Sequence, residues 1–267
     1  MARDIFANSR RLKRGVFLKR TIVSVFVLGV ITAALISFFY IPYFKVTSIE
    51  ISGVQSLNAA TVESAAANFI AGREFWILPR SSIFVLSEDM IVSHLMKSFP
   101  RLNQVAMKID GVSPAAALIS LSERTTWAVV CRVDSCFYAS ADGFLFERAP
   151  ADTGSFFLRI DDNRDESYDI GSVFINRPEL DRIQTITGKI KSATNADIDT
   201  ISLNKKEVYY YEAFNDTGWK IIFDSLTDPI RAAENFALAY KDTFNEDLSK
   251  VDYIDLRLEN RIFYKEK

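Results

Sequence analysis

The sequence is poor in the residues that build catalytic and metal centres. It has one histidine, His94, and two cysteines among its 267 residues. Zinc sites in proteins use four ligands, mostly cysteine and histidine, so these residues are too few to complete one. A histidine base in a hydrolase would have to be His94, which lies in an expected helix without an HExxH pattern. The composition therefore disfavours zinc peptidases and histidine-dependent hydrolases.

One motif of a histidine-free hydrolase occurs. The stretch 202–205, Ser-Leu-Asn-Lys, matches the S-x-x-K pattern of penicillin-binding enzymes, where it opens a helix and is joined by S-x-N and K-T-G elements. Here it falls in a strand pattern, and no K-T-G follows. The paired carboxylates Asp161-Asp162 lie in a polar stretch. We therefore expect no catalytic residue, no metal, no cofactor and no small-molecule substrate, and we predict that the protein is not an enzyme.

Charge is distributed unevenly, although the net charge is only −2. Seven of the 32 Lys and Arg residues lie in the first twenty positions, which contain one of the 34 acidic residues, Asp4. The rest of the chain is therefore acidic. Because binding to nucleic acid requires a basic footprint that neutralises phosphates, we expect no nucleic-acid partner for this main body.

A long uncharged run follows the basic tail. Residues 21–44 contain no charged side chain. As a helix they would span about 36 Å, enough to cross a hydrocarbon core of about 30 Å. Aromatic residues gather at the far end of the run, as at a membrane interface, and Pro42 is expected to end the helix. A cleaved signal peptide is the alternative, but its apolar core is shorter and ends in small residues.

We therefore expect an uncleaved transmembrane anchor over residues 21–43 and a basic cytoplasmic tail over residues 1–20. Basic flanking residues stay in the cytoplasm, so the rest of the chain is expected outside the inner (plasma) membrane.

The first expected domain, residues 44–124, has the pattern β-α-α-β-β. Its two helices are expected after Asn58, as N-cap, and after Ser87, and Gly72 is expected as a left-handed residue that ends the first helix. Its strands show apolar alternation and are expected near residues 46–51, 105–109 and 117–121.

The second expected domain, residues 125–267, has short strands and turns with two helices, which begin after Asn176 and Asp228. Asp142-Gly143 favours a tight two-residue hairpin turn. The predicted fold class is therefore α+β, with a mostly antiparallel sheet flanked by helices.

The last residues show the pattern of one well-specified strand. In YIDLRLENRIFYK, residues 253–265, even positions are almost wholly apolar and odd positions mostly charged. Side chains alternate between the two faces of a strand, so this pattern predicts one apolar and one charged face.

The two cysteines, Cys131 and Cys136, flank a four-residue loop, RVDS, between two expected strands. They would face each other at the end of a hairpin, near the Cα separation that a disulfide needs. Export from the cytoplasm permits oxidation. The sequence leaves two alternatives open, a disulfide and a reduced pair.

Taken in order, these elements resemble the FtsQ/DivIB cell-division proteins of bacteria, and the 44–124 module resembles a POTRA domain. The motifs that carry the resemblance are LSER at Leu121–Arg124, the hairpin around Asp142-Gly143, and YIDLR at Tyr253–Arg257. The chain departs from the family at Ser140, where members often have aspartate, and at Leu258, where some members have an aromatic residue. The cysteine pair is also not a general family feature.

The resemblance implies a septal scaffold that links early and late division proteins and influences septal peptidoglycan synthesis. Its implied partners are FtsB-like and FtsL-like proteins and the septal synthase complex, and in the family a partner segment adds as a strand beside the final strand. An open sheet edge offers unpaired backbone groups for such addition. The expected partner-binding residues are Arg257, Leu258, Glu259, Asn260, Arg261, Ile262, Phe263 and Tyr264.

Three alternatives to this reading remain. The final strand is a central strand with a solvated charged face, the protein is another POTRA-bearing envelope assembly factor, or it is an anchored envelope serine hydrolase.

Overall fold

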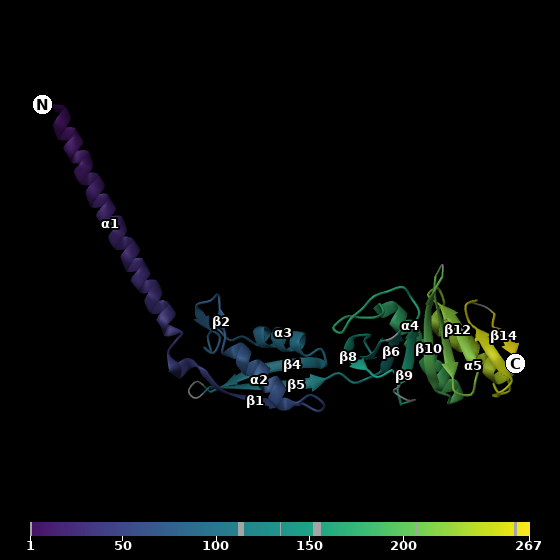
Figure 1. The fold of residues 1–267 in the computed structure, drawn as a ribbon. Coiled ribbons are helices and arrows are strands. Elements are labelled where there is room, and N and C mark those ends of the chain that lie inside the picture. Colours follow the sequence, from purple (N-terminus) through teal and green to yellow (C-terminus); the bar gives the residue numbers. More distant parts are fainter. Residues whose placement is uncertain (1, 112–114, 134, 152–155, 207, 259–260) are drawn as a thin grey trace. The chain divides into compact units, whose positions relative to one another are not determined.

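The computed structural model describes residues 2–111, 115–133, 135–151, 156–206, 208–258 and 261–267. The chain divides into two compact units, the first made of residues 1–98 and 102–123 and the second of residues 99–101 and 124–267 (Figure 1). The described residues contain five α-helices and a large, mostly antiparallel sheet. The predicted α+β class, with a mostly antiparallel sheet and helices, is confirmed.

Helix α1 (Ala2–Phe38) contains a segment, Lys19–Phe38, that is long and apolar enough to cross a membrane. No part of this segment is buried by the described protein, which distinguishes it from a core helix. The prediction that the helix continues to Pro42 is wrong. A residue before proline is pushed out of the helical region, and Ile41 is indeed extended. Pro42 instead opens a short 3-10 helix, η1 (Pro42–Phe44).

The first unit has a three-stranded sheet in the order β1-β5-β4, with β1 parallel and β4 antiparallel to β5. Helices α2 and α3 pack on this sheet. A two-stranded hairpin that the sequence pattern did not indicate lies between the two helices. The elements are β1 (Val46–Ser52), α2 (Ala59–Ile70), β2 (Arg73–Glu74), β3 (Leu78–Pro79), α3 (Glu88–Ser98), β4 (Leu102–Asp110) and β5 (Ala115–Glu123).

The start of α2 is as predicted, whereas its end is not. The Asn58 side chain accepts hydrogen bonds from the backbone N–H groups of Ala60 and Thr61, as an N-cap does. At the other end, α2 is followed by Ala71 in the right-handed helical region, and Gly72 does not adopt a positive φ. The chain leaves the helix directly into β2, so no left-handed residue is needed.

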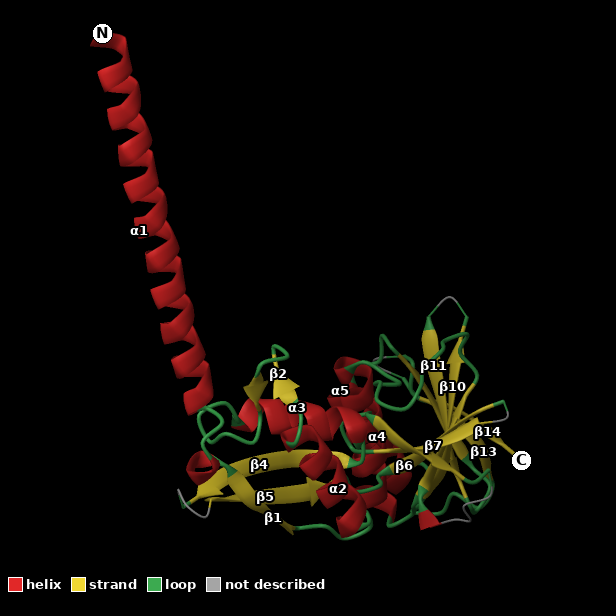
Figure 2. Ribbon diagram, turned by 60° about the vertical axis from the view of Figure 1, so that its left-hand side comes forward, coloured by secondary structure: helices red, strands yellow, loops and turns green. Residues whose placement is uncertain are grey.

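The second unit has a nine-stranded sheet in the order β14-β13-β12-β11-β10-β9-β6-β7-β8. Helices α4 and α5 pack against each other and against one face of this sheet (Figure 2). Asn176 and Asp228 cap the two helices as predicted. The elements are β6 (Ala128–Arg132), β7 (Ser135–Ala139), β8 (Leu145–Ala149), β9 (Leu158–Asp162), α4 (Arg177–Thr194), β10 (Ile198–Lys205), β11 (Tyr209–Asn215), β12 (Lys220–Asp224), α5 (Pro229–Asp242), β13 (Val251–Asp255) and β14 (Phe263–Glu266).

Two adjacent residues of the LSER motif act in different units. In the first unit, the Glu123 carboxylate accepts hydrogen bonds from three successive backbone N–H groups, those of Gln55 (2.7 Å), Ser56 (2.9 Å) and Leu57 (3.1 Å). These contacts close the turn between β1 and α2 onto the end of β5.

In the second unit, Arg124 holds the connection between β7 and β8. Its Nη1 donates to Asp142 Oδ2 (2.9 Å) and to Ser140 Oγ (3.2 Å), and the guanidinium lies over the Phe144 ring. Burial of Asp142 opposes ionisation, but the hydrogen bonds from Ser140 and Arg124 and the arginine charge outweigh it and lower the pKa of Asp142. Arg124 of the LSER motif is thus hydrogen-bonded to the turn that contains Asp142-Gly143.

The expected two-residue hairpin at Asp142-Gly143 is wrong in detail. Five residues, 140–144, connect β7 to β8. The Gly143 N–H donates to the Ser140 carbonyl (2.9 Å), and Gly143 has φ +81°. Asp142 precedes this glycine as a hydrogen-bonding residue of the turn and does not share its positive φ.

Replacing Glu123 with alanine should leave three backbone N–H groups without their carboxylate acceptor. We expect the free energy of unfolding of the first unit to fall by about 1–3 kcal/mol, because hydrogen bonds to a charged group stabilise more than neutral ones even though water can reach these N–H groups. Urea titration of the full chain in detergent, read by hydrogen exchange at the β5 amides, measures this change. Glu63→Ala, an exposed position on α2, is the matched control. An equal effect of the two substitutions would contradict the role given to Glu123.

Candidate partner-binding edge

The expected single final strand is in fact a hairpin. β13 ends at Asp255, the chain turns, and β14 returns antiparallel to β13. β13 lies between β12 and β14, and β14 is at the end of the sheet order. The prediction of one strand over residues 253–265 is therefore wrong. Tyr253–Asp255 of the YIDLR segment lie on the interior strand β13, Leu256 and Arg257 follow it, and the edge belongs to Phe263–Glu266.

The alternation of side chains could not distinguish these two arrangements. In the hairpin Ile254 lies opposite Tyr264, and Tyr253 lies opposite Lys265. Even-numbered residues therefore face even-numbered residues across the pair, and directly opposed side chains point to the same face of a sheet. A continuous strand and a hairpin with this register give the same apolar and polar faces.

Asp255 provides a local reason for the turn. Its Oδ1 accepts hydrogen bonds from the backbone N–H of Arg257 (3.1 Å) and from the Arg257 Nε (2.9 Å). A carboxylate that bonds the backbone two residues ahead forms an Asx-turn, which bends the chain out of the extended conformation. A further backbone bond, from Arg261 N–H to the Leu258 carbonyl (3.4 Å), lies in the returning segment.

The backbone groups of β14 that face away from the sheet can be identified by alternation. The Leu256 N–H donates to Ile222 of β12 (2.8 Å), so the backbone of Ile254, two residues earlier, also faces β12. The intervening residues Tyr253 and Asp255 therefore face β14, opposite Lys265 and Phe263.

The end of β14 gives the same result independently. The Lys267 N–H donates to the Lys250 carbonyl (2.9 Å), so its backbone faces β13. Because every second residue of a strand directs its backbone groups to the same side, Lys265 and Phe263 also face β13. The N–H and C=O groups of Tyr264 and Glu266 consequently point outward from the edge of the described sheet.

The opposite edge of the same sheet differs. The segment after β9 returns along the start of β8, where the Leu145 N–H donates to Ser172 (2.9 Å) and the Gly171 N–H donates to Leu145 (2.8 Å). Phe144 also forms a bridge with Val173. The chain thus covers the start of β8 itself, whereas β14 pairs with β13 alone among the described strands.

The predicted partner-binding residues fall into three groups. Phe263 and Tyr264 belong to β14 and are 52% and 46% exposed, and Ile262 is half-buried against the core. Arg257, Leu258 and Arg261 lie exposed in the connection between the strands. Glu259 and Asn260 lie outside the described residues.

The charges next to the edge are already partly paired. Arg257 forms a bidentate pair with Asp255, and Lys265 Nζ lies 3.1 Å from Asp252 Oδ2. The hydrogen bond to Asp255 raises the pKa of Arg257, although burial opposes this shift. Asp255 and Arg257 thus each have a counter-ion in their own chain, which leaves little of their charge for a partner strand.

Besides its backbone pairing with β13 and the Lys265–Asp252 pair, two further contacts hold β14 on the sheet. The Tyr264 ring meets the Phe244 ring, which follows α5, edge to face at 5.0 Å between centroids. The Lys267 Nζ reaches the backbone carbonyl oxygen of Ser249 (3.0 Å). Phe263, opposite Asp255, is on the other face, away from α5. β14 is thus fixed on its inner side, while no strand in the described part of the chain pairs with its outer side.

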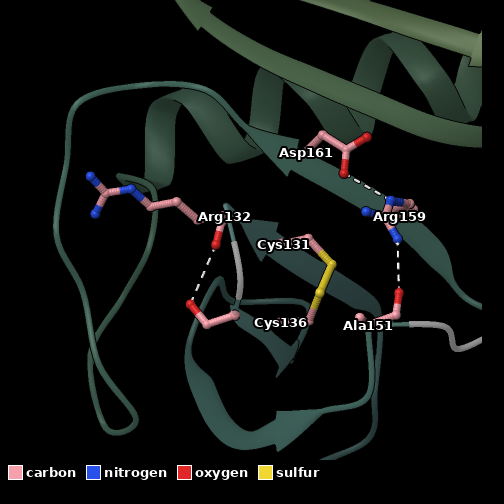
Figure 3. Close-up of a disulfide and its surroundings, with 7 residues drawn as sticks. Cys131, Arg132, Cys136, Ala151, Arg159 and Asp161 are labelled. Atoms are coloured by element: carbon pink, nitrogen blue, oxygen red, sulfur yellow. Dashed lines mark hydrogen bonds and ion pairs between the residues drawn. A yellow bond between two sulfur atoms is a disulfide. The ribbon is translucent and has the colours of Figure 1, made fainter.

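The cysteine pair lies elsewhere in the second unit. Cys131 and Cys136 are directly opposite each other on β6 and β7 and are joined as a disulfide (Figure 3). The strands extend to Arg132 and Ser135, so the loop is shorter than the four residues expected. Nearby, Arg159 pairs with Asp161 and donates to the carbonyl of Ala151. The disulfide links β6 to β7, and the Arg159 contacts tie β9 to the segment that follows β8.

The S-x-x-K motif is not assembled into a catalytic pair. Ser202 and Lys205 are three residues apart on β10, so their side chains point to opposite faces of the sheet. The Ser202 Oγ accepts a hydrogen bond from Asn163 Nδ2 (2.8 Å), and Lys205 Nζ lies over the Tyr209 ring. His94 stacks on Phe69 in the first unit.

The chain matches no protein-family model, and no curated protein matches it.

If the Tyr264–Phe244 contact holds β14 in place, Phe244→Ala should loosen it. We expect the amides of Phe263 and Lys265, which face β13, to exchange about tenfold faster, since an aromatic pair contributes about 0.5–1.5 kcal/mol beyond its buried area. Hydrogen exchange of the full chain in detergent measures this.

Leu238→Ala, at a position 62% exposed on α5, is the control and should leave these amides unchanged. The amides of Ile254 and Leu256, which face β12, report on the rest of the sheet. Unaltered exchange at Phe263 and Lys265 in Phe244→Ala would contradict the proposed anchoring of β14.

Proposed function

We propose that this protein is a membrane-anchored, non-enzymatic scaffold of the FtsQ/DivIB type that captures an extracytoplasmic partner by β-strand addition to β14. The observation that carries the proposal is the outward orientation of the Tyr264 and Glu266 backbone groups at the end of a nine-stranded sheet. Its FtsB-like and FtsL-like partners and its role at the septum come from the family resemblance.

The order of the elements supports the proposal. A helix long and apolar enough to cross a membrane comes first, after a basic tail that favours a cytoplasmic N-terminus. A β-α-α-β-β unit follows, and then the sheet that ends in β14. In this arrangement the open edge belongs to an anchored protein, so its partner would be reached on the outer side of the same membrane.

Strand addition at β14 would supply only part of the binding energy. Two outward-facing residues offer two N–H and two C=O groups, and each hydrogen bond contributes about 0.5–1.5 kcal/mol. About 4 kcal/mol in total corresponds at most to a Kd near 1 mM, before the entropy cost of association is subtracted. Side chains beside the edge must therefore contribute, and Phe263 and Leu258, each 52% exposed, are the apolar groups available to a partner strand.

The backbone contribution can be separated from the side chain at one position. Glu266→Pro removes an outward-facing N–H, whereas Glu266→Ala keeps this donor and removes only the side chain. We expect the proline variant to bind the FtsB-like segment up to about tenfold more weakly, the effect of one lost hydrogen bond, and the alanine variant to bind as wild type does. Calorimetry with the partner peptide measures both, and equal affinities for the two variants would rule out backbone pairing at this edge.

The division role is tested separately in cells. Depletion of the protein should give filaments without septa, and a fluorescently tagged copy should gather at midcell. Normal division after depletion would contradict the septal role while leaving strand addition at β14 open to the peptide measurement.

A further inference from the structure

An exposed aromatic turn, residues Glu74–Ile77, joins β2 to β3 in the first unit. The Ile77 N–H donates to the Glu74 carbonyl (3.1 Å), so Phe75 and Trp76 are the two central residues. Phe75 is 77% exposed and Trp76 is 92% exposed. The β2–β3 hairpin projects from α2 and α3 (Figures 1 and 2). Large apolar side chains at such a tip bury little surface within the chain.

The backbone of the aromatic turn has a conformation that bulky side chains rarely adopt. Phe75 has φ +46° and Trp76 has φ +66°. Two-residue turns with both central residues in this region normally contain asparagine and glycine, which tolerate positive φ. Two bulky aromatic residues there combine backbone strain with exposure to water. Strain at non-glycine residues is typical of positions that serve a function.

The aromatic turn is tied to the end of the candidate membrane helix. The Tyr40 hydroxyl, two residues after the end of α1, donates to the carbonyl of Ile77. Beside it, the ring of Phe38, the last residue of α1, contacts the rings of Phe44 and Phe84. The tip is therefore held where α1 emerges, and Tyr and Trp side chains are enriched at that depth, at the interface of membrane and water.

The polar groups beside the tip suit phosphate. Arg73, Arg80, Phe75 and Trp76 line a surface hollow of about 460 Å³. Arg80 is paired with Glu74 at 2.9 Å, and Arg73 is exposed. Guanidinium groups next to aromatic rings match the boundary of a bilayer, where lipid phosphates lie directly above acyl chains.

From these contacts we infer that the aromatic turn inserts into the headgroup region of the bilayer that α1 crosses. Phe75 and Trp76 enter the boundary with the acyl chains, and Arg73 meets lipid phosphates. The inference rests on the proposed membrane anchoring by α1 but not on strand addition at β14. A second membrane contact restricts rotation of the first unit about the helix axis.

The test uses the full chain in vesicles of phosphatidylcholine and phosphatidylglycerol whose acyl chains carry bromine near the headgroup. Bromine quenches tryptophan only on contact. We expect the brominated lipids to quench the fluorescence of Trp76. The wild type should therefore lose more tryptophan fluorescence than Trp76→Phe, which lacks this residue. Trp127 and Trp219 remain in both proteins as internal references.

The matched control places the same probe on the same unit but away from the membrane. Gln55 is exposed and lies beyond the far end of β1, a strand about 20 Å long. In Trp76→Phe with Gln55→Trp, the new tryptophan should be quenched by aqueous iodide and not by brominated lipid.

Each other outcome contradicts the inference. If the protein floats with the vesicles but Trp76 is quenched by iodide and not by lipid, the turn lies in water, free for a protein partner, and only the anchor is supported. Equal lipid quenching at positions 55 and 76 would show that contact is not specific to the turn. If the protein does not float, both the anchor and the insertion of the turn are wrong.

Discussion

Backbone N–H and C=O groups at the open edge of a sheet must be satisfied by water or by another strand, and this constraint determines how the second unit can act. One edge of its sheet is partly covered by the chain itself, near the start of β8. At the other edge, Tyr264 and Glu266 direct their backbone groups away from β13. A partner strand would exchange bonds to water for bonds to protein, which is the physical basis of strand addition.

An edge that pairs with a partner strand would have to attract that strand without attracting copies of itself. Natural proteins protect edge strands by keeping them short and by placing lysine on them. β14 has four residues and carries Lys265, and Lys267 follows it. The small number of outward-facing groups also limits what backbone pairing alone can contribute. Selectivity for a partner strand would then come from exposed side chains such as Phe263 rather than from Asp255 and Arg257, which neutralise each other.

Local signals in the sequence predicted the starts of three helices correctly, although the helix end at Gly72 and the two-residue turn at Asp142-Gly143 were predicted wrongly. Asn58, Asn176 and Asp228 cap helices because a short polar side chain satisfies the first free N–H groups wherever a helix starts. Features set by distant contacts were missed. At residues 253–265, alternation of apolar and charged residues cannot distinguish one strand from a hairpin in which even-numbered residues lie opposite even-numbered ones. Likewise, no local pattern indicates that Glu123 binds the turn at residues 55–57.

The sequence pattern located the candidate edge within residues 253–265 but did not show which of these residues form the edge strand. Phe263 and Tyr264 lie on the edge strand, whereas Arg257 and Leu258 lie in a connection that the alternating pattern concealed. The central claim is most directly tested by hydrogen exchange of the full chain with and without a saturating FtsB-like peptide. We predict strong slowing at the Tyr264 and Glu266 amides and little change at Phe263 and Lys265, which already face β13. Binding that leaves the Tyr264 and Glu266 amides unprotected would contradict strand addition at β14.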